Sequence, residues 1–244
     1  MGNKYENIRY VRRKVISNLI ICTLVMSVGA LCLAPLDDAL VTEMESSKLY
    51  SSAKEDGVGI SLMFNVYWGT EEVYRILDTL ETYQAKATFF IGGCWADDNV
   101  DCLRAIYEKG HEIGNHGYFH KEHDRLDLPN NQKEIASCNR FIELSLGEAP
   151  KLFAPPSGAY NEDTLKAAGL LGMQTILWSK DTIDWRDKNA ALIYSRATQG
   201  VTVGEFILMH PMKETADALE DILKYYKAQN WAVVTVSENL KKEG

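Results

Sequence analysis

The sequence lacks several patterns that would assign its function at once. No Cys-x-x-Cys pair occurs among its five cysteines, so neither a thioredoxin-type redox motif nor a cysteine-based structural zinc site is indicated. Lys and Arg number 26 against 34 Asp and Glu. Nucleic-acid binding needs clustered positive charge, so we do not expect nucleic acid as a partner. No internal repeat or low-complexity segment is present. At 244 residues, the chain suits one globular domain, or one domain with an appendage.

Charge is also missing from one long stretch near the start. Residues 15–36 contain no Asp, Glu, Lys or Arg, and at 22 residues they are long enough to cross a bilayer. The first 36 residues carry five basic side chains against Glu6 alone, a net charge of +4 that leaves −12 for the remainder. Because positive charge stays on the cytoplasmic side, we expect 1–14 to be a cytoplasmic stub and 15–36 a transmembrane signal-anchor. The body would then be extracytoplasmic and held at the membrane.

A cleaved signal peptide is the alternative for the same segment. Its basic start fits, but the apolar run is long for that purpose, and Pro35 would obstruct cleavage after Ala34. We therefore favour an uncleaved anchor. Residues 37–56 are polar and include four serines, which predicts a tether between the bilayer and a domain at 57–244.

Three cysteines, Cys94, Cys102 and Cys138, fall in that domain. A Cys94–Cys102 disulfide is compatible with an oxidising compartment, but we favour three separate buried thiols.

Short apolar runs alternate with amphipathic stretches throughout the domain, which predicts a parallel sheet with helices outside it. Strands are expected over 57–66, 86–92, 111–116, 152–156, 173–179, 205–210 and 231–237. Helices are expected over 70–83, 100–109, 130–146, 161–169, 188–199 and 213–229. A barrel and a doubly wound sheet would both fit this alternation. In either case a functional site is expected at the carboxyl ends of the strands.

Polar residues, together with the turn residues of the Pro-Pro-Ser-Gly segment, collect at those ends. The residues concerned are Asn65, His116, His120, Pro155, Pro156, Gly158, Asp181, Asp184 and His210. Two of them, His116 and His120, are four residues apart, a spacing that can direct both imidazoles toward one metal ion. That spacing alone is weak evidence, since surface histidines are common.

Five ordered motifs strengthen it. They are KATFF at 86–90, GHEIGNHGYFH at 110–120, APPSG at 154–158, DTIDW at 181–185 and LMH at 208–210. Together they resemble the NodB-type polysaccharide deacetylases, carbohydrate esterase family four, over nearly the whole of 57–240. FNVYWG at 64–69 is similar to a sporulation-associated branch of that family.

The resemblance implies a distorted (β/α) barrel that hydrolyses the N-acetyl amide (carbon–nitrogen) bonds of a cell-wall glycan such as peptidoglycan. It further implies a divalent metal, normally zinc, on His116 and His120, with His210 as general acid beside Asp184 and with Asp181 in the catalytic set. Trp185, Leu208, Pro156, Gly158 and Tyr160 would bind substrate.

The sequence departs from the family at three positions. The motif Thr-Phe-Asp-Asp is replaced, so the base position is Asn65 and the third-ligand position is Val66, and Ala154 stands where an Arg usually holds the base. An amide cannot take up a proton at neutral pH. An Arg left without its carboxylate would be a costly unpaired charge, so these losses are coherent.

Two functions remain open from the sequence. One is an active metal-dependent hydrolase, which needs a substitute ligand or base from Glu71, Glu72, Asp181 or His123, although these residues also read as ordinary helix-start and loop residues. The other is a catalytically degenerate glycan-binding or scaffold protein of the cell envelope or spore. No pattern in the sequence specifies an oligomeric state.

Overall fold

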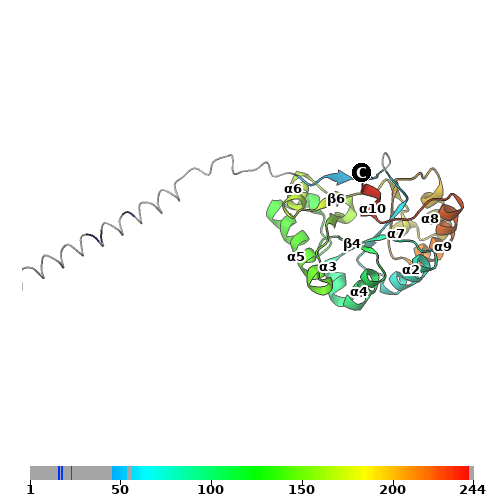
Figure 1. Ribbon diagram of the computed structural model, residues 1–244, viewed down its shortest axis with the longest axis horizontal. Helices are drawn as coiled ribbons and strands as arrows, with labels where there is room; N and C mark the ends of the chain where they lie inside the picture. Colours follow the sequence, from blue (N-terminus) through cyan, green and yellow to red (C-terminus); the bar gives the residue numbers. More distant parts are fainter. Residues whose placement is uncertain (1–15, 17, 19–22, 24–45, 54–56, 242–244) are drawn as a thin grey trace, which may run out of the picture. The chain divides into compact units, whose positions relative to one another are not determined.

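The computed structural model describes residues 46–53 and 57–241, together with 16, 18 and 23 (Figure 1). The stub predicted at 1–14, most of the anchor predicted at 15–36 and the first part of the tether lie outside these residues. Among the described residues, no helix combines the length and the apolar character needed to span a bilayer. Met44–Gly244 makes up one compact unit, which is described here by itself.

Eight strands form one curled parallel sheet that resembles part of a barrel (Figure 1). The order across the sheet is β1-β6-β5-β4-β3-β2-β8-β7, so the edge strands are β1 and β7, and the barrel is incomplete. The strands are β1 Leu49–Tyr50, β2 Ser61–Val66, β3 Thr88–Ile91, β4 Glu112–Asn115, β5 Leu152–Phe153, β6 Gln174–Ile176, β7 Lys180–Asp181 and β8 Phe206–Met209. The expected α/β fold with a parallel sheet is therefore confirmed, and the distorted barrel that the resemblance implied is a curled half-barrel among the described residues.

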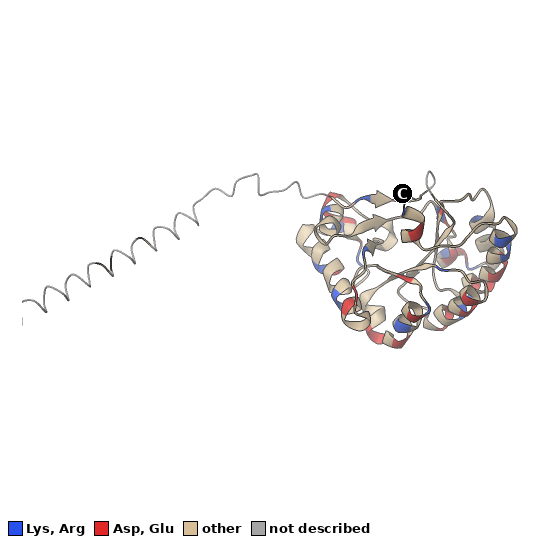
Figure 2. Ribbon diagram, in the orientation of Figure 1, with Lys and Arg blue, Asp and Glu red and all other residues tan. Residues whose placement is uncertain are grey.

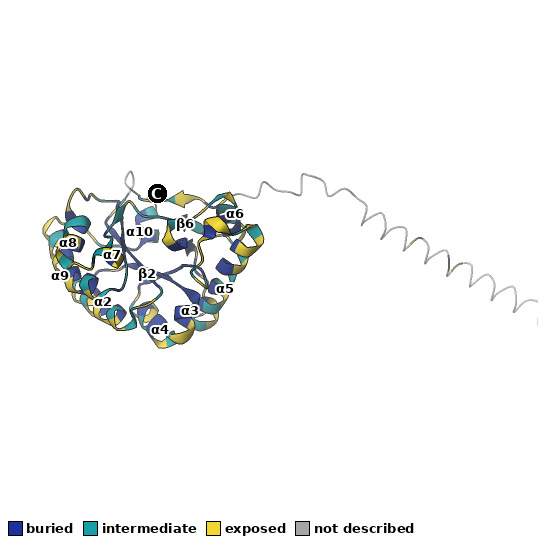
Figure 3. Ribbon diagram, turned by 180° about the vertical axis from the view of Figure 1, so that it is seen from behind, coloured by how far each residue is buried: buried dark blue, intermediate teal, exposed yellow. Residues whose placement is uncertain are grey.

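Helices cover the outer side of this sheet, with buried faces inward and exposed faces outward (Figure 3). They are α2 Thr70–Thr82, α3 Gly93–Asp98, α4 Val100–Glu108, α5 Leu128–Leu146, α6 Glu162–Leu170, α7 Asp184–Asp187, α8 Ala190–Thr198 and α9 Lys213–Ala228. The last helix, α10 Val236–Leu240, packs instead on the inner side through Val236 and Leu240. Two short 3-10 turns, η2 His123–Arg125 and η3 Pro156–Gly158, lie between them. Acidic and basic residues are concentrated on the outer helices (Figure 2).

Local sequence explains where the main helices begin and end. In α2 the apolar residues Val73, Ile76, Leu77 and Leu80 recur at helical spacing, and all four are buried. Asp127 caps α5 by accepting the Asn130 N–H, and Gly147 ends α5 in the left-handed conformation. Asn161 and Thr164 form a reciprocal capping box at the start of α6. These helices were all expected from the sequence.

The strands separate two apolar layers, as the alternation of side chains along a strand requires. Along β2, Leu62, Phe64 and Val66 belong to the core that packs under the helices. Met63 faces the other way and joins Phe90, Leu152, Ala154, Ile176, Phe206 and Val236 in a cluster inside the curl of the sheet. The interior of the half-barrel is thus filled with side chains up to the level of the carboxyl ends.

Two expectations were wrong at the margins of the sheet. The strand expected at 231–237 is reduced to one bridge between Ile60 and Val233, because Thr235 and Glu238 form a capping box that starts α10 at Val236. The tether expected at 37–56 ends earlier, because Leu49 and Tyr50 pair with Thr175 and Ile176. The segment is mostly polar, which predicted a tether. Its strand lies at the edge of the sheet, where Leu49 stays exposed.

Candidate functional site

His116 follows β4 and is held in a fixed orientation. Its side chain is 1% exposed, and its Nδ1 lies 2.7 Å from the Ala154 carbonyl oxygen. A carbonyl can only accept, so Nδ1 carries the proton and Nε2 keeps a lone pair. Burial, with a smaller contribution from His120, holds the pKa of His116 well below its usual value. A neutral imidazole fixed through its other nitrogen is the form that binds a metal ion.

His120 lies beside it in a tight loop. The two imidazole centroids are 5.0 Å apart, with the ring planes at 68°. His120 has a φ of +53°, and Gly117, with a φ of +74°, allows the turn between them. Burial also lowers the pKa of His120. The predicted pair is therefore brought together, with both rings neutral at physiological pH.

Glu134 of α5 and Asn115 of β4 hold the loop that carries His120 in place. Glu134 is 4% exposed and accepts the Phe119 N–H at 2.8 Å, while its other oxygen pairs with Lys121 at 2.9 Å. Asn115 Oδ1 accepts the Gly117 N–H at 2.7 Å. Nothing in the sequence motifs pointed to Glu134, because its role depends on the packing of α5 against the loop.

His210 and Asp184 form the second half of the site. Asp184 is fully buried, and its Oδ1 lies 2.8 Å from His210 Nδ1. Its other oxygen accepts the His210 backbone N–H at 2.6 Å and the Thr215 hydroxyl at 2.7 Å. Four donors, including the Trp185 N–H at 2.8 Å, thus point at one carboxylate. His210 is left with Nε2 as its reactive atom, an orientation suited to proton transfer.

Two aromatic residues cover the halves of the site, and sequence reasoning assigned neither a role. The Tyr67 ring centroid is 4.6 Å from that of His120, and the Trp68 ring stacks on His210 at 5.6 Å with the planes 6° apart. Both follow β2 directly within FNVYWG, so that motif marked their place. The segment therefore links the two histidine groups.

The structure gives the three replaced positions uncharged surroundings. Asn65 is 4% exposed, and Val66 and Ala154 are fully buried. Val66 packs in the apolar core under the helices, and Ala154 packs in the interior cluster. Val66 and Ala154 carry no atom that can bind a metal ion, and the Asn65 amide cannot accept a proton at neutral pH.

The substitute residues considered from the sequence do not complete the site. Within the described residues, no three His, Cys, Asp or Glu side chains gather closely enough to hold a metal ion. Asp181 Oδ1 accepts the Ile183 N–H at 2.7 Å in its own turn. His123 is buried against Asn131, with Nδ1 2.6 Å from that amide oxygen. The donor set thus offers two imidazoles and does not fit a catalytic zinc ion, which normally takes three protein ligands.

The predicted substrate-binding residues are spread over several elements: Pro156, Gly158 and Tyr160 follow β5, Trp185 lies in α7, and Leu208 lies within β8. Trp185 is 50% exposed and Tyr160 is 36% exposed, whereas Leu208 is 2% exposed. Pro156 and Gly158 form the 3-10 turn after β5. Trp185 follows Asp184 in the chain and donates its backbone N–H to that carboxylate, while its side chain is exposed.

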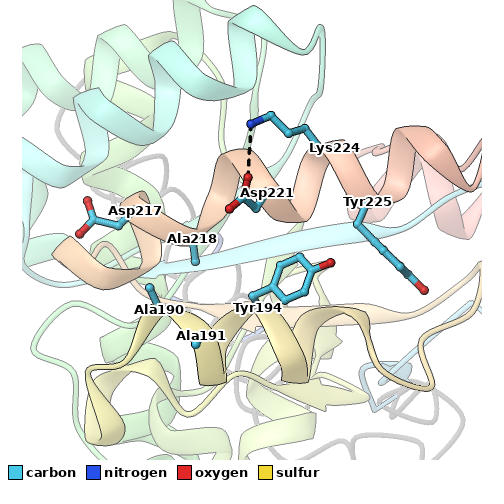
Figure 4. Close-up of a pocket in the computed structure, with 8 residues that line it drawn as sticks. All are labelled: Ala190, Ala191, Tyr194, Asp217, Ala218, Asp221, Lys224 and Tyr225. Atoms are coloured by element: carbon cyan, nitrogen blue, oxygen red, sulfur yellow. Dashed lines mark hydrogen bonds and ion pairs between the residues drawn. The ribbon is translucent and has the colours of Figure 1, made fainter.

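A separate surface groove lies between α8 and α9, with small residues at its floor and charged residues at its edge (Figure 4). It is lined by Ala190, Ala191, Tyr194, Asp217, Ala218, Asp221, Lys224 and Tyr225. Its charges are paired, since Asp217 contacts Arg75 at 2.6 Å and Asp221 contacts Lys224 at 3.3 Å. None of the residues predicted from the sequence lines it, so we place the candidate site at the strand ends.

The three cysteines of the domain are not part of the candidate site. Cys94, Cys102 and Cys138 are unpaired thiols. Burial raises the pKa of Cys102 to about 11 and that of Cys138 to about 12, which makes both thiols unreactive.

Comparison with known proteins gives consistent matches. A family profile described as polysaccharide deacetylase matches residues 53–176. The uncharacterized protein YlxY of Bacillus subtilis is 36% identical over 179 residues, which is 73% of this chain and 56% of YlxY. The peptidoglycan-N-acetylglucosamine deacetylase PgdA of Listeria monocytogenes is 32% identical over 164 residues, 67% of this chain and 34% of PgdA. The chain thus spans little more than half of one relative and a third of the other.

A solved structure matches the fold over most of the chain. It is a CE4-family pseudoenzyme from Bacillus anthracis, 31% identical, with a TM-score of 0.78, covering 81% of this chain and 70% of that one.

Proposed function

This chain belongs to the polysaccharide deacetylase family, and on that basis we propose that it acts on the N-acetyl groups of a cell-wall glycan with low turnover. The observation that carries the proposal is the pairing of His210 with the buried carboxylate of Asp184, next to the His116 and His120 pair. The relative PgdA is by name a peptidoglycan-N-acetylglucosamine deacetylase, which supports an N-acetylated glycan such as peptidoglycan as the ligand.

His210 and Asp184 can supply the general acid that amide hydrolysis needs. Amide cleavage requires a proton on the departing amine, and a positioned histidine supplies it from Nε2. Asp184 holds Nδ1 of His210, which fixes the ring so that Nε2 is the free atom. We assign His210 as the proton donor and Asp184 as its positioning residue.

The residues that would activate the attacking water are replaced. Asn65 cannot take a proton from water, and loss of a general base typically costs a factor of about 10²–10⁴ in rate. Val66 supplies no ligand, so His116 and His120 would hold a divalent metal such as zinc less firmly than three ligands do. The proposal is therefore a hydrolase of the N-acetyl amide bond whose turnover is far below that of a complete site.

The replaced residues favour a second function in the same site. Asn65, Val66 and Ala154 are all uncharged and buried, and the similar structure from Bacillus anthracis is named a pseudoenzyme. A site that keeps its binding surface and loses turnover would serve as a glycan-binding or scaffold protein of the envelope or spore.

One pair of measurements separates these functions. The full chain is incubated with tetra-N-acetylchitotetraose and with peptidoglycan, with and without Zn²⁺, and both acetate release and glycan binding are measured. If the chain is a hydrolase, acetate release should be slow, and His210→Ala should abolish it. The control Glu143→Ala, an exposed change on α5, should leave acetate release unchanged. Binding without acetate release supports the glycan-binding function, and no binding contradicts both.

The N-terminal region is part of the same proposal. We infer that residues 15–36 anchor the domain to the membrane, with the N-terminus in the cytoplasm and the catalytic-type domain outside. The run without charge and the basic residues before it support this topology. Protease added to intact protoplasts should remove the domain; full protection of the domain would contradict the topology.

The FNVYWG segment supports a place in the sporulation-associated branch. A deletion strain of a spore-forming host should then show altered peptidoglycan in the spore and unchanged peptidoglycan in growing cells. The opposite pattern would contradict that assignment.

A further inference from the structure

Asn65 lies between the two histidine groups. The register pairs Met63 with Leu208 and Phe64 with Met209, so the next residue of β2, Asn65, is level with His210. On the other side Asn65 pairs with Phe90. Because side chains alternate along a strand, Asn65 faces the interior of the half-barrel, as Met63 does.

The row continues from Phe90 to His116. Phe90 pairs with Gly114 on β4, and a Cβ at Gly114 would lie 2.4 Å from Cδ1 of the Phe90 ring. The ring thus occupies the place of a side chain at 114, and His116 is the next residue of that chain segment to face inward. His210, Asn65 and His116 therefore occupy successive places across the carboxyl ends of the sheet.

Asn65 carries an unused hydrogen-bond acceptor in this row. Its side chain is 4% exposed, and its Oδ1 accepts no hydrogen bond from any residue that the structure describes. Buried polar atoms are normally paired, and an unpaired one points to a ligand or a functional role. The Nδ1 atoms of the two histidines in the row already have partners, His116 Nδ1 with the Ala154 oxygen and His210 Nδ1 with Asp184.

The geometry points to a ligand that brings an N–H donor. We propose that Asn65 is a specificity residue whose Oδ1 accepts the acetamido N–H of an N-acetylated sugar. The inference rests on the proposed function and names the atom that recognises the N-acetyl group. A carboxamide suits this partner, since it also offers N–H donors for the acetyl carbonyl, which a carboxylate cannot do.

Two exposed aromatic residues belong to segments that adjoin the row at His210 and Asp184. Trp68 is 39% exposed and stacks on His210, and Trp185 is 50% exposed next to Asp184. Such rings offer apolar faces with polar edges, which suit a sugar ring above the row. The acetamido group would then enter between the histidine groups, where Asn65 is the acceptor.

The test compares two tetramers that differ at one position of each sugar unit. Tetra-N-acetylchitotetraose carries the N–H, whereas cellotetraose acetylated at each O2 places an ester oxygen there. Dissociation constants are measured by calorimetry on the full chain in detergent micelles at low temperature. The unmodified protein should bind the N-acetyl tetramer about tenfold more tightly, because one hydrogen bond to an otherwise unpaired buried atom has about that effect.

Variants then locate the preference. Asn65→Ala and Asn65→Leu remove the acceptor, and each should reduce the preference to about one; Leu keeps the volume if Ala does not fold. Asn65→Asp keeps an acceptor and should keep a preference for the N-acetyl tetramer. Asn130→Ala, an exposed asparagine on α5, is the matched control and should retain the preference of the unmodified chain.

The outcomes separate the inference from the proposed function. If the chain binds the N-acetyl tetramer and Asn65→Ala or Asn65→Leu keeps the full preference, the inference is wrong and the proposed function stands. If the unmodified chain binds both tetramers equally, the inference is also wrong. If it binds neither tetramer, the proposed function fails and the inference fails with it.

Discussion

At the scale of single residues, His116 and His210 are oriented by the same device. Each is fixed through Nδ1, His116 by the Ala154 carbonyl and His210 by the Asp184 carboxylate. Both therefore present Nε2 as the free atom. The partners differ in charge: the one for His116 is a neutral carbonyl, whereas the one for His210 is a carboxylate.

The Asp184 network should contribute strongly to stability. In Asp184→Ala, four hydrogen-bond donors lose their acceptor in a buried position. We expect the free energy of unfolding to fall by about 3 kcal/mol. Asp221→Ala, an exposed change on α9, should alter it by less than about 0.5 kcal/mol. Equal losses in urea unfolding of the two variants would contradict this role of Asp184.

His111 provides a test of pH dependence away from the site. It is buried, and burial lowers its pKa to about 4. The unfolded chain then binds the proton more readily, so the stabilisation is complete above about pH 6.5 and is lost as the pH falls toward 4. His111→Gln should reduce the loss of unfolding free energy over that range by at most about 3 kcal/mol. Urea unfolding from pH 4 to 7 measures this, and identical slopes for the two proteins would contradict it.

At the scale of elements, local signals predicted the helices better than the edge of the sheet. The start of α6 follows from the side chains of Asn161 and Thr164, which are three residues apart. The strand expected at 231–237 was wrong because its apolar alternation resembles a strand, while the cap at Thr235 favours a helix. The pairing of Leu49 with Thr175 joins residues distant in sequence, and no local pattern reports such a contact.

The loop that carries His120 depends on α5. Glu134→Ala removes the acceptor of the Phe119 N–H and the partner of Lys121. We expect amide hydrogen exchange at 117–121 to become faster by about five- to tenfold, since a paired buried group is worth about 1 kcal/mol. Glu143→Ala, on the exposed side of the same helix, is the control. Unchanged exchange in Glu134→Ala would mean that the loop is held by other contacts.

At the scale of the whole molecule, the sequence predicted which residues lie at the strand ends, but not the packing between them. Motif order placed the polar residues at neighbouring strand ends, because parallel strands share one carboxyl edge. The curl of the sheet, the stacking of Trp68 on His210 and the unpaired acceptor of Asn65 depend on packing between distant segments. Residue identity alone showed that the base and the third ligand are replaced.

A substitution at position 66 tests whether a third metal ligand can be restored beside His116 and His120. Val66 is fully buried among apolar side chains, so Val66→Asp should lower the melting temperature of the metal-free protein. Zn²⁺ should restore much of the loss, because the new carboxylate would join His116 and His120 as a third ligand. Val73→Asp, in the same core but on α2, should be destabilised without recovery in Zn²⁺. Equal behaviour of the two variants would contradict a metal site at these histidines.

The central claim is that the acid half of a deacetylase site is intact while the base and third ligand are replaced. Acetate release from tetra-N-acetylchitotetraose with Zn²⁺ tests it most directly, when the unmodified chain is compared with the variant Asn65→Asp, Val66→Asp, Ala154→Arg. The predicted result is an increase of about a hundredfold or more in the variant, the usual contribution of a general base. A folded, metal-loaded variant that releases acetate no faster than the unmodified chain would contradict the claim.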